Sequence, residues 1–151
     1  MGIETDIHQA TFKSGRQKAM INLLYSYGWV IEQIRLFLSD EDITHQQYNI
    51  LRILRGSYPQ PLSTLQIRER MLDKMSDTSR IVDRLVSKGL VEKTVCPADK
   101  RLVDVTVSEK GKELLAKLDA GSDHINEVMN SLSEDEAEQL SALLDKLRTK
   151  D

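Results

Sequence analysis

The chain is poor in several residue types, and each shortage excludes a class of protein. Its single cysteine, Cys96, excludes an intrachain disulfide framework and is typical of a reducing cytoplasm, where we expect the protein to be located. The three histidines, His8, His45 and His124, lie far apart, so we expect no metal site. No apolar run approaches the roughly 18 residues that span a bilayer, and the polar first ten residues, which we expect to be loosely held, do not form a secretory signal. We therefore expect no membrane association.

Positive charge is also in short supply, because the net charge is −3. The charge is unevenly distributed: residues 61–112 hold 11 Lys/Arg against 8 Asp/Glu, whereas the rest of the chain is acidic. Fields beyond roughly 8–10 Å are screened at physiological salt, so local charge decides whether phosphates bind. The middle of the chain is therefore the candidate surface for a polyanion.

A long helical pattern, free of proline, covers residues 14–38. One apolar stripe comprises Met20, Leu24, Tyr27, Ile31, Ile34 and Leu38. Tyr25, Trp29 and Leu36 form a second line on the opposite face. A helix that is apolar on two sides must pack between two bodies, and we expect one of them to be a second subunit. Tyr25 and Trp29 either pack in that dimer or line a cleft for a small aromatic or amphipathic ligand.

Short helices and a β-hairpin are expected in the remainder of the chain. The helices are predicted at 44–56, 63–71, 73–88, 108–131 and from 133 toward the C-terminus. Between them the period changes from 3.6 to 2, which predicts strands at 90–96 and 103–107 joined by a polar turn. A capping box, Ser133-Glu134-Asp135-Glu136, opens the last helix. The leucines expected on the buried side of that helix are Leu140, Leu143, Leu144 and Leu147.

The third of these short helices, capped by Asp73 or Ser76 and ended by Gly89, has the pattern of a DNA-reading helix. Its predicted inward residues are Met75, Thr78, Val82 and Leu85. Small hydroxyls at Ser76 and Ser79 leave its first turn slim enough to approach base edges. Arg80 and Arg84, one turn apart, suit guanine edges or phosphates. An ordinary solvated helix has a similar polar face, but these details favour DNA recognition.

The hairpin tip is Pro97-Ala98-Asp99-Lys100-Arg101. Arginine is favoured in the minor groove because it is weakly hydrated and the narrow groove concentrates negative potential. Asp99 would be repelled by phosphates, so we expect it to support the loop or Arg101 by a charge-assisted hydrogen bond. In isolation, the five residues equally suit an ordinary polar turn.

Together these segments resemble the MarR-type (multiple antibiotic resistance) winged-helix regulators over roughly residues 14–148. The motifs that carry the resemblance are Ile43-Thr44-His45-Gln46-Gln47-Tyr48, Arg80-Ile81-Val82-Asp83-Arg84-Leu85, Lys88-Gly89-Leu90-Val91, Asp99-Lys100-Arg101 and Val107-Ser108-Glu109-Lys110-Gly111. Each motif is weak alone, and their order and spacing make the resemblance specific.

The resemblance implies a mainly α fold with a small β-hairpin wing. It implies a DNA-binding domain at 41–108, and helices in 1–40 and 109–151 that form a dimerisation region. The expected function is a homodimeric, sequence-specific transcriptional regulator, a repressor, that binds a palindrome in double-stranded DNA and is released by a small-molecule ligand. The residues expected to contact DNA are Ser76, Asp77, Ser79, Arg80, Arg84, Lys100 and Arg101.

Two positions depart from the family pattern, and the cysteine that the oxidation-sensing branch has near the start of its first helix is absent. Arg68 stands where a small alanine is usual, and Thr78 replaces an aliphatic residue of the reading helix. Cys96 lies at the base of the wing, far from the cysteine of the oxidation-sensing branch, so we expect a packing role rather than a sensor.

Two other functions have less support in the sequence. The sequence contains no phosphate-binding glycine loop, metal-ligand cluster or nucleophile beside an activating base, so we expect no enzyme and no cofactor. A winged helix used only for protein interaction is the alternative, and it would not need the basic hairpin tip.

Overall fold

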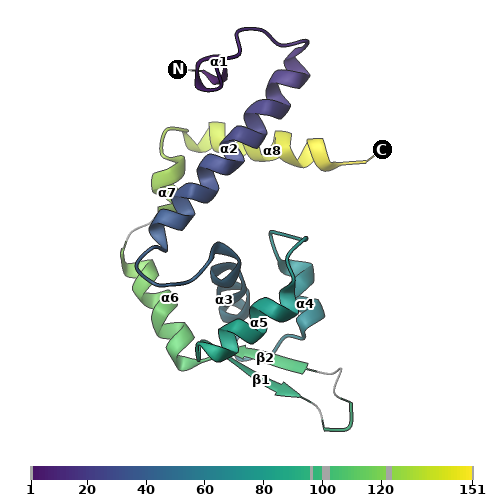
Figure 1. Cartoon of the computed structure of the whole chain (residues 1–151), viewed down its shortest axis with the longest axis vertical. Helices are drawn as coiled ribbons and strands as arrows, with labels where there is room; N and C mark the ends of the chain where they lie inside the picture. Colours follow the sequence, from purple (N-terminus) through teal and green to yellow (C-terminus); the bar gives the residue numbers. More distant parts are fainter. Residues whose placement is uncertain (1, 96, 100–102, 122–123, 151) are drawn as a thin grey trace. The chain divides into compact units, whose positions relative to one another are not determined.

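The structure is a computed structural model that describes residues 2–95, 97–99, 103–121 and 124–150. It divides into two compact units, Met1–His45 and Gln46–Asp151. The elements in chain order are α1 (Ile3–Asp6), α2 (Gly15–Phe37), α3 (His45–Ser57), α4 (Thr64–Arg70), α5 (Thr78–Ser87), β1 (Val91–Val95), β2 (Val103–Val107), α6 (Glu109–Gly121), α7 (His124–Met129) and α8 (Glu134–Arg148) (Figure 1). Helices joined to one antiparallel hairpin confirm the predicted fold class.

The first unit contains α1 and α2. Ser14 caps α2 by accepting a hydrogen bond from the Gln17 backbone N–H at 3.1 Å, at the predicted start of the helix. The expectation of a loosely held N-terminus is wrong. Residues Ile3–Asp6 form α1, Ile3 is buried, and Glu4 pairs with Lys18 of α2. A single buried side chain and one ion pair were not visible as a pattern in ten mostly polar residues.

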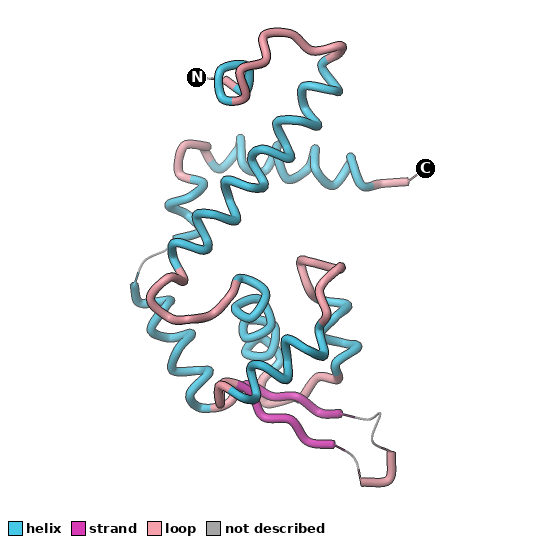
Figure 2. The backbone as a smooth tube through the Cα atoms, in the orientation of Figure 1, coloured by secondary structure: helices cyan, strands magenta, loops and turns pink. Residues whose placement is uncertain are grey.

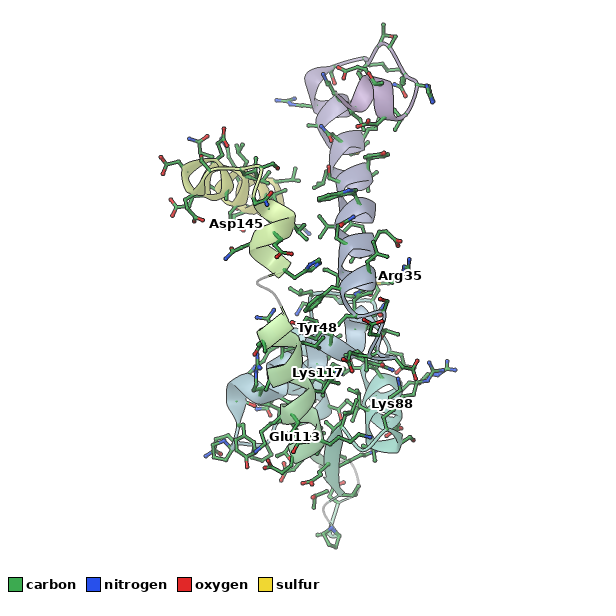
Figure 3. All side chains as sticks on the ribbon, turned by 90° about the vertical axis from the view of Figure 1, so that its left-hand side faces the viewer. Arg35, Tyr48, Lys88, Glu113, Lys117 and Asp145 are labelled. Atoms are coloured by element: carbon green, nitrogen blue, oxygen red, sulfur yellow. The ribbon has the colours of Figure 1, made fainter. Side chains whose placement is uncertain are left out.

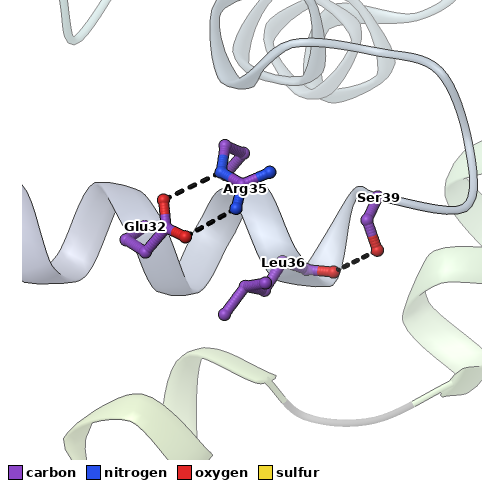
Figure 4. A network of polar contacts seen from close by, with 4 residues as sticks. All are labelled: Glu32, Arg35, Leu36 and Ser39. Atoms are coloured by element: carbon purple, nitrogen blue, oxygen red, sulfur yellow. Dashed lines mark hydrogen bonds and ion pairs between the residues drawn. The ribbon is translucent and has the colours of Figure 1, made fainter.

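The C-terminal end of α2 is closed by local polar contacts (Figure 4). Arg35 donates two hydrogen bonds to the Glu32 carboxylate, at 2.6 and 2.8 Å. These bonds hold the pKa of the Glu32 carboxyl below its ordinary value. The Leu36 carbonyl accepts two hydrogen bonds from Ser39, one from its hydroxyl at 2.8 Å and one from its backbone N–H at 3.2 Å.

The second unit is built around α3, α4, α5 and the hairpin. Its core side chains, each at most 1% exposed, are Ile50, Leu51, Leu54, Ile67, Val82, Leu85, Val105 and Leu115. β1 and β2 pair from Val91↔Val107 to Val95↔Val103 and follow directly on α5 (Figure 2). Leu62, just before α4, forms an additional antiparallel bridge with Val105 that the hairpin pattern did not predict.

The residues that follow α5 and the residue that precedes α6 are hydrogen-bonded to each other at the base of the hairpin. Gly89, with a positive φ of 73°, ends α5 as predicted. Ser108 donates its hydroxyl hydrogen to the Gly89 carbonyl at 2.7 Å and accepts a hydrogen bond from the Gly111 N–H at 3.0 Å. Its backbone N–H donates to the Leu90 carbonyl at 3.1 Å. Ser108 therefore caps α6, at the predicted start of that helix, and also fixes the base of the hairpin.

The last two helices complete the second unit. The capping box of Ser133 and Glu136 is present at the start of α8 and confirms that prediction. The predicted burial of the leucines of α8 is wrong for the single chain, because no residue of α8 is buried and Leu147 is 67% exposed. The predicted single helix over 108–131 is described as α6 and α7, and the residues between them lie outside the described part of the chain.

Candidate DNA interface

The start of α5 is set by two aspartates with different tasks. Asp73 accepts a hydrogen bond from the Met75 N–H at 3.0 Å, and its carbonyl accepts the Ser76 hydroxyl at 2.8 Å. These contacts close a turn before the helix. Asp77 is the actual N-cap, since its carboxylate accepts the Arg80 N–H at 3.3 Å. The prediction that Asp73 or Ser76 caps the helix is therefore wrong, because both are used in the preceding turn.

The inward face of α5 is confirmed at three of four positions. Thr78, Val82 and Leu85 are buried, whereas Met75 is 93% exposed. The prediction for Met75 is wrong because it assumed that helical periodicity extends to a residue that lies two positions before the cap. Thr78 lies inside as predicted, and its Oγ1 has no hydrogen-bond partner among the described residues. A threonine in place of the family's aliphatic residue thus keeps the packing and leaves one polar atom unsatisfied.

The outward face of α5 presents two arginines. Arg80 and Arg84 are exposed, and neither has an ion pair or side-chain hydrogen bond within the described part of the chain. The acid between them, Asp83, is paired with Lys93 of β1 at 2.9 Å. This pair links α5 to the hairpin and compensates a carboxylate that would otherwise repel phosphates. The two guanidinium groups therefore remain available to an anionic partner.

The other residues near the start of α5 that were predicted to contact DNA differ in their exposure and in whether their side chains are already hydrogen-bonded. Ser79 is exposed at the first turn of α5. Ser76 is half-buried, and its hydroxyl already serves the turn before the helix. Asp77 is exposed, but its carboxylate caps α5. Lys88, which is labelled in Figure 3, was not among the predicted DNA contacts, and its ammonium donates a hydrogen bond to Gln47 Oε1 at 3.3 Å within the same unit.

An open groove of about 440 Å³ lies between α4 and the start of α5. Its lining residues are Thr64, Leu65, Arg68, Met75, Ser76, Asp77, Thr78 and Ser79. Arg68 is exposed in this groove, so the departure from alanine does not crowd the crossing of the two helices. Arg68, Leu65 and Met75 were not among the DNA contacts predicted from the sequence. The signal that could have found them is the pair of short helices, which brings the outer face of α4 to the first turn of α5.

Three residues of the predicted hairpin tip belong to the described part of the chain. Pro97 and Ala98 are exposed and Asp99 is half-buried. Lys100 and Arg101, predicted to contact DNA, lie outside the described residues, as does Cys96. Their roles stay predictions.

The two residues considered for a ligand cleft lie in the first unit. Tyr25 and Trp29 occupy successive turns of α2 and are 46% and 48% exposed. Over the described ranges of the chain, no group of three His, Cys, Asp or Glu side chains is arranged to hold a metal ion. Nor does any helix in those ranges have the length and apolar character needed to cross a membrane.

Comparisons with known proteins agree with this arrangement. Residues 43–103 match the model of the MarR family. The chain is 31% identical to a MarR transcription factor from Planctomyces limnophilus, covering 89% of this chain and 98% of that structure, with a TM-score of 0.67.

Two further relatives extend the match. The HTH-type transcriptional regulator MhqR of Bacillus subtilis (strain 168) is 28% identical over 130 residues, which are 84% of this chain and 87% of MhqR. A mutant MarR from E. coli, solved in complex with operator DNA, is 25% identical, with a TM-score of 0.72 over 99% of this chain and all of that one. This chain belongs to the MarR family of transcriptional regulators.

Proposed function

We propose that the protein binds a palindromic operator in double-stranded DNA as a homodimer and thereby represses transcription. The observation that carries the proposal is the outer face of α5. There Arg80 and Arg84 are exposed while the neighbouring Asp83 is compensated by Lys93. A helix of this kind fits the major groove of B-DNA, and the hairpin beside it reaches an adjacent minor groove. The related E. coli MarR, which forms a complex with operator DNA, supports the same use of the fold.

The homodimer is supported by apolar surface that the single chain does not bury. Neither α2 nor α8 contains a buried residue. Their most exposed apolar side chains are Met20, Leu24, Tyr27, Leu143 and Leu147. Such a concentration of exposed apolar side chains is typical of an interface, and a second copy of the chain is the expected occupant. We assign residues 1–40 and 109–151 to dimerisation and 41–108 to DNA binding.

Release of DNA by a small aromatic or amphipathic ligand is the second part of the proposal. Tyr25 and Trp29 support it, since half-exposed aromatic rings one turn apart can stack on such a molecule. Packing in the dimer is the competing role. Trp29 is the sole tryptophan, so its fluorescence separates the two: a ligand shifts it at constant protein concentration, whereas dimer packing alone responds only to dilution.

Arg101→Ala is expected to weaken DNA binding roughly fivefold or more, because it removes the cation best suited to the minor groove. Fluorescence anisotropy with duplex DNA from the region upstream of the gene measures the change at moderate salt. Light scattering should still report twice the 17.2 kDa of the chain. Wild-type affinity in this variant would support the alternative, a winged helix used only for protein interaction.

A further inference from the structure

Two apolar side chains stand on the surface that we assign to DNA. Met75 is 93% exposed and Leu65 is 63% exposed, and both line the groove between α4 and α5. Leu72, which like Met75 lies in the connection between α4 and α5, is 88% exposed but does not line the groove. Apolar side chains beside a DNA-reading helix require an explanation other than core packing, because burial in this chain does not account for them.

The position of Met75 is held by its neighbours. Its backbone N–H donates to Asp73 Oδ1 at 3.0 Å. The Lys74 ammonium contacts the Arg68 carbonyl at 3.4 Å at the end of α4, so the preceding side chain is folded back. The Leu72 N–H donates to Asn49 Oδ1 at 3.0 Å and fixes the start of the connection. The turn therefore presents Met75 outward from a defined backbone rather than from a loose loop.

Charged and polar side chains surround the two apolar side chains, and they include the carboxylate of Asp77, which lines the groove and caps α5. Arg68 and Ser79 line the same groove, and Arg80 follows in the first turn of α5. Arg68 and Arg80 favour a partner that offers negative charge, and the two apolar side chains favour one with exposed methyl groups nearby. The major groove of B-DNA does so, because phosphates border it and each thymine presents its C5-methyl group there. The minor groove carries no such methyl group.

We propose that Met75 and Leu65 contact thymine C5-methyl groups in the major groove, and that they make thymine a determinant of operator specificity. The inference rests on the proposed DNA-binding function. Methionine suits the role because its flexible, polarizable side chain adapts to the position of the methyl group. Arginines at 80 and 84 then read guanine edges or phosphates, and the groove between α4 and α5 adds a separate preference for thymine.

The test uses the duplex that the wild-type protein selects from random DNA, synthesised with deoxyuridine in place of one thymidine at a time. Uracil keeps the base pair and removes only the methyl group. Loss of one buried methyl contact corresponds to an affinity roughly three to five times lower. We expect such a loss at one or two thymines in each half-site and none elsewhere.

The variant Met75→Gln assigns the effect to a residue, because glutamine keeps the length of the side chain and removes its apolar end. At the thymine that Met75 contacts, the affinities for the thymine duplex and the uracil duplex should become about equal, so that their ratio falls to about one. Leu72→Gln is the matched control, since Leu72 is equally exposed outside the groove, and its ratio should equal that of the wild type.

Three results would overturn the inference. Selective binding without any loss on uracil substitution overturns it and leaves the proposed function intact. A Met75→Gln variant with an altered oligomeric mass and an unchanged ratio places the methionine in a protein interface. Absence of any binding to duplex DNA by the wild-type protein overturns the proposed function, and this inference with it.

Discussion

The double variant Arg80→Ala/Arg84→Ala is expected to bind the selected operator roughly a hundredfold or more weakly than the wild-type protein, because each good bidentate contact to a base contributes about 1–3 kcal/mol. Both side chains are exposed on α5 and have no ion pair or side-chain hydrogen bond among the described residues. Their removal should therefore leave the thermal midpoint nearly unchanged. Anisotropy titrations at several salt concentrations measure the loss.

A matched control separates recognition from simple loss of charge. The variant Lys13→Ala/Arg16→Ala removes the same two positive charges from exposed positions at the start of α2. We expect it to bind within about twofold of the wild type, since both residues belong to the segment that we assign to dimerisation and not to DNA binding. Equal losses in the two double variants would contradict the assignment of α5 as the reading helix.

Replacing Gly111 by alanine is expected to lower the free energy of unfolding by about 3 kcal/mol. A Cβ at this position would lie 2.3 Å from the Leu90 carbonyl oxygen and 2.7 Å from Val107 Cγ2. The Leu90 carbonyl cannot move aside easily, because it also accepts a hydrogen bond from the Ser108 N–H at the base of the hairpin. Urea denaturation measures the change, and the thermal midpoint should fall by roughly 6–12 °C.

The control is Gly56→Ala in α3, where an added Cβ meets no atom within 4 Å. There alanine should be neutral or stabilise the helix by up to about 1 kcal/mol. If Gly111→Ala were as stable as Gly56→Ala, the close approach between α6 and the base of the hairpin would be wrong.

Local patterns predicted many elements correctly. The start of α2 near Ser14 and the capping box at Ser133 were predicted because such signals need only a few neighbouring residues. The hairpin followed from the change of period, and Gly89 from its place after the helix. Such features depend on residues close in sequence, so one sequence is enough to find them.

The missed features depend on residues far apart in the chain. Lys93 and Asp83, which form an ion pair, are ten residues apart in the sequence. Leu62 and Val105, which form a β-bridge, are 43 residues apart. The exposure of Met75 was missed for a different reason, since the helical wheel was extended past the cap at Asp77. At the site, Arg80 and Arg84 were predicted to point outward and do so. The groove that adds Leu65 and Met75 required the packing of α4 beside α5.

Selection of bound duplexes from random DNA, followed by the mass of the resulting complex, tests the central claim most directly. We expect a palindrome whose half-site centres lie about one helical turn apart, roughly 34 Å, with two chains on each duplex. Recovery of no sequence above the random background, or of an asymmetric site that binds one chain, would contradict it.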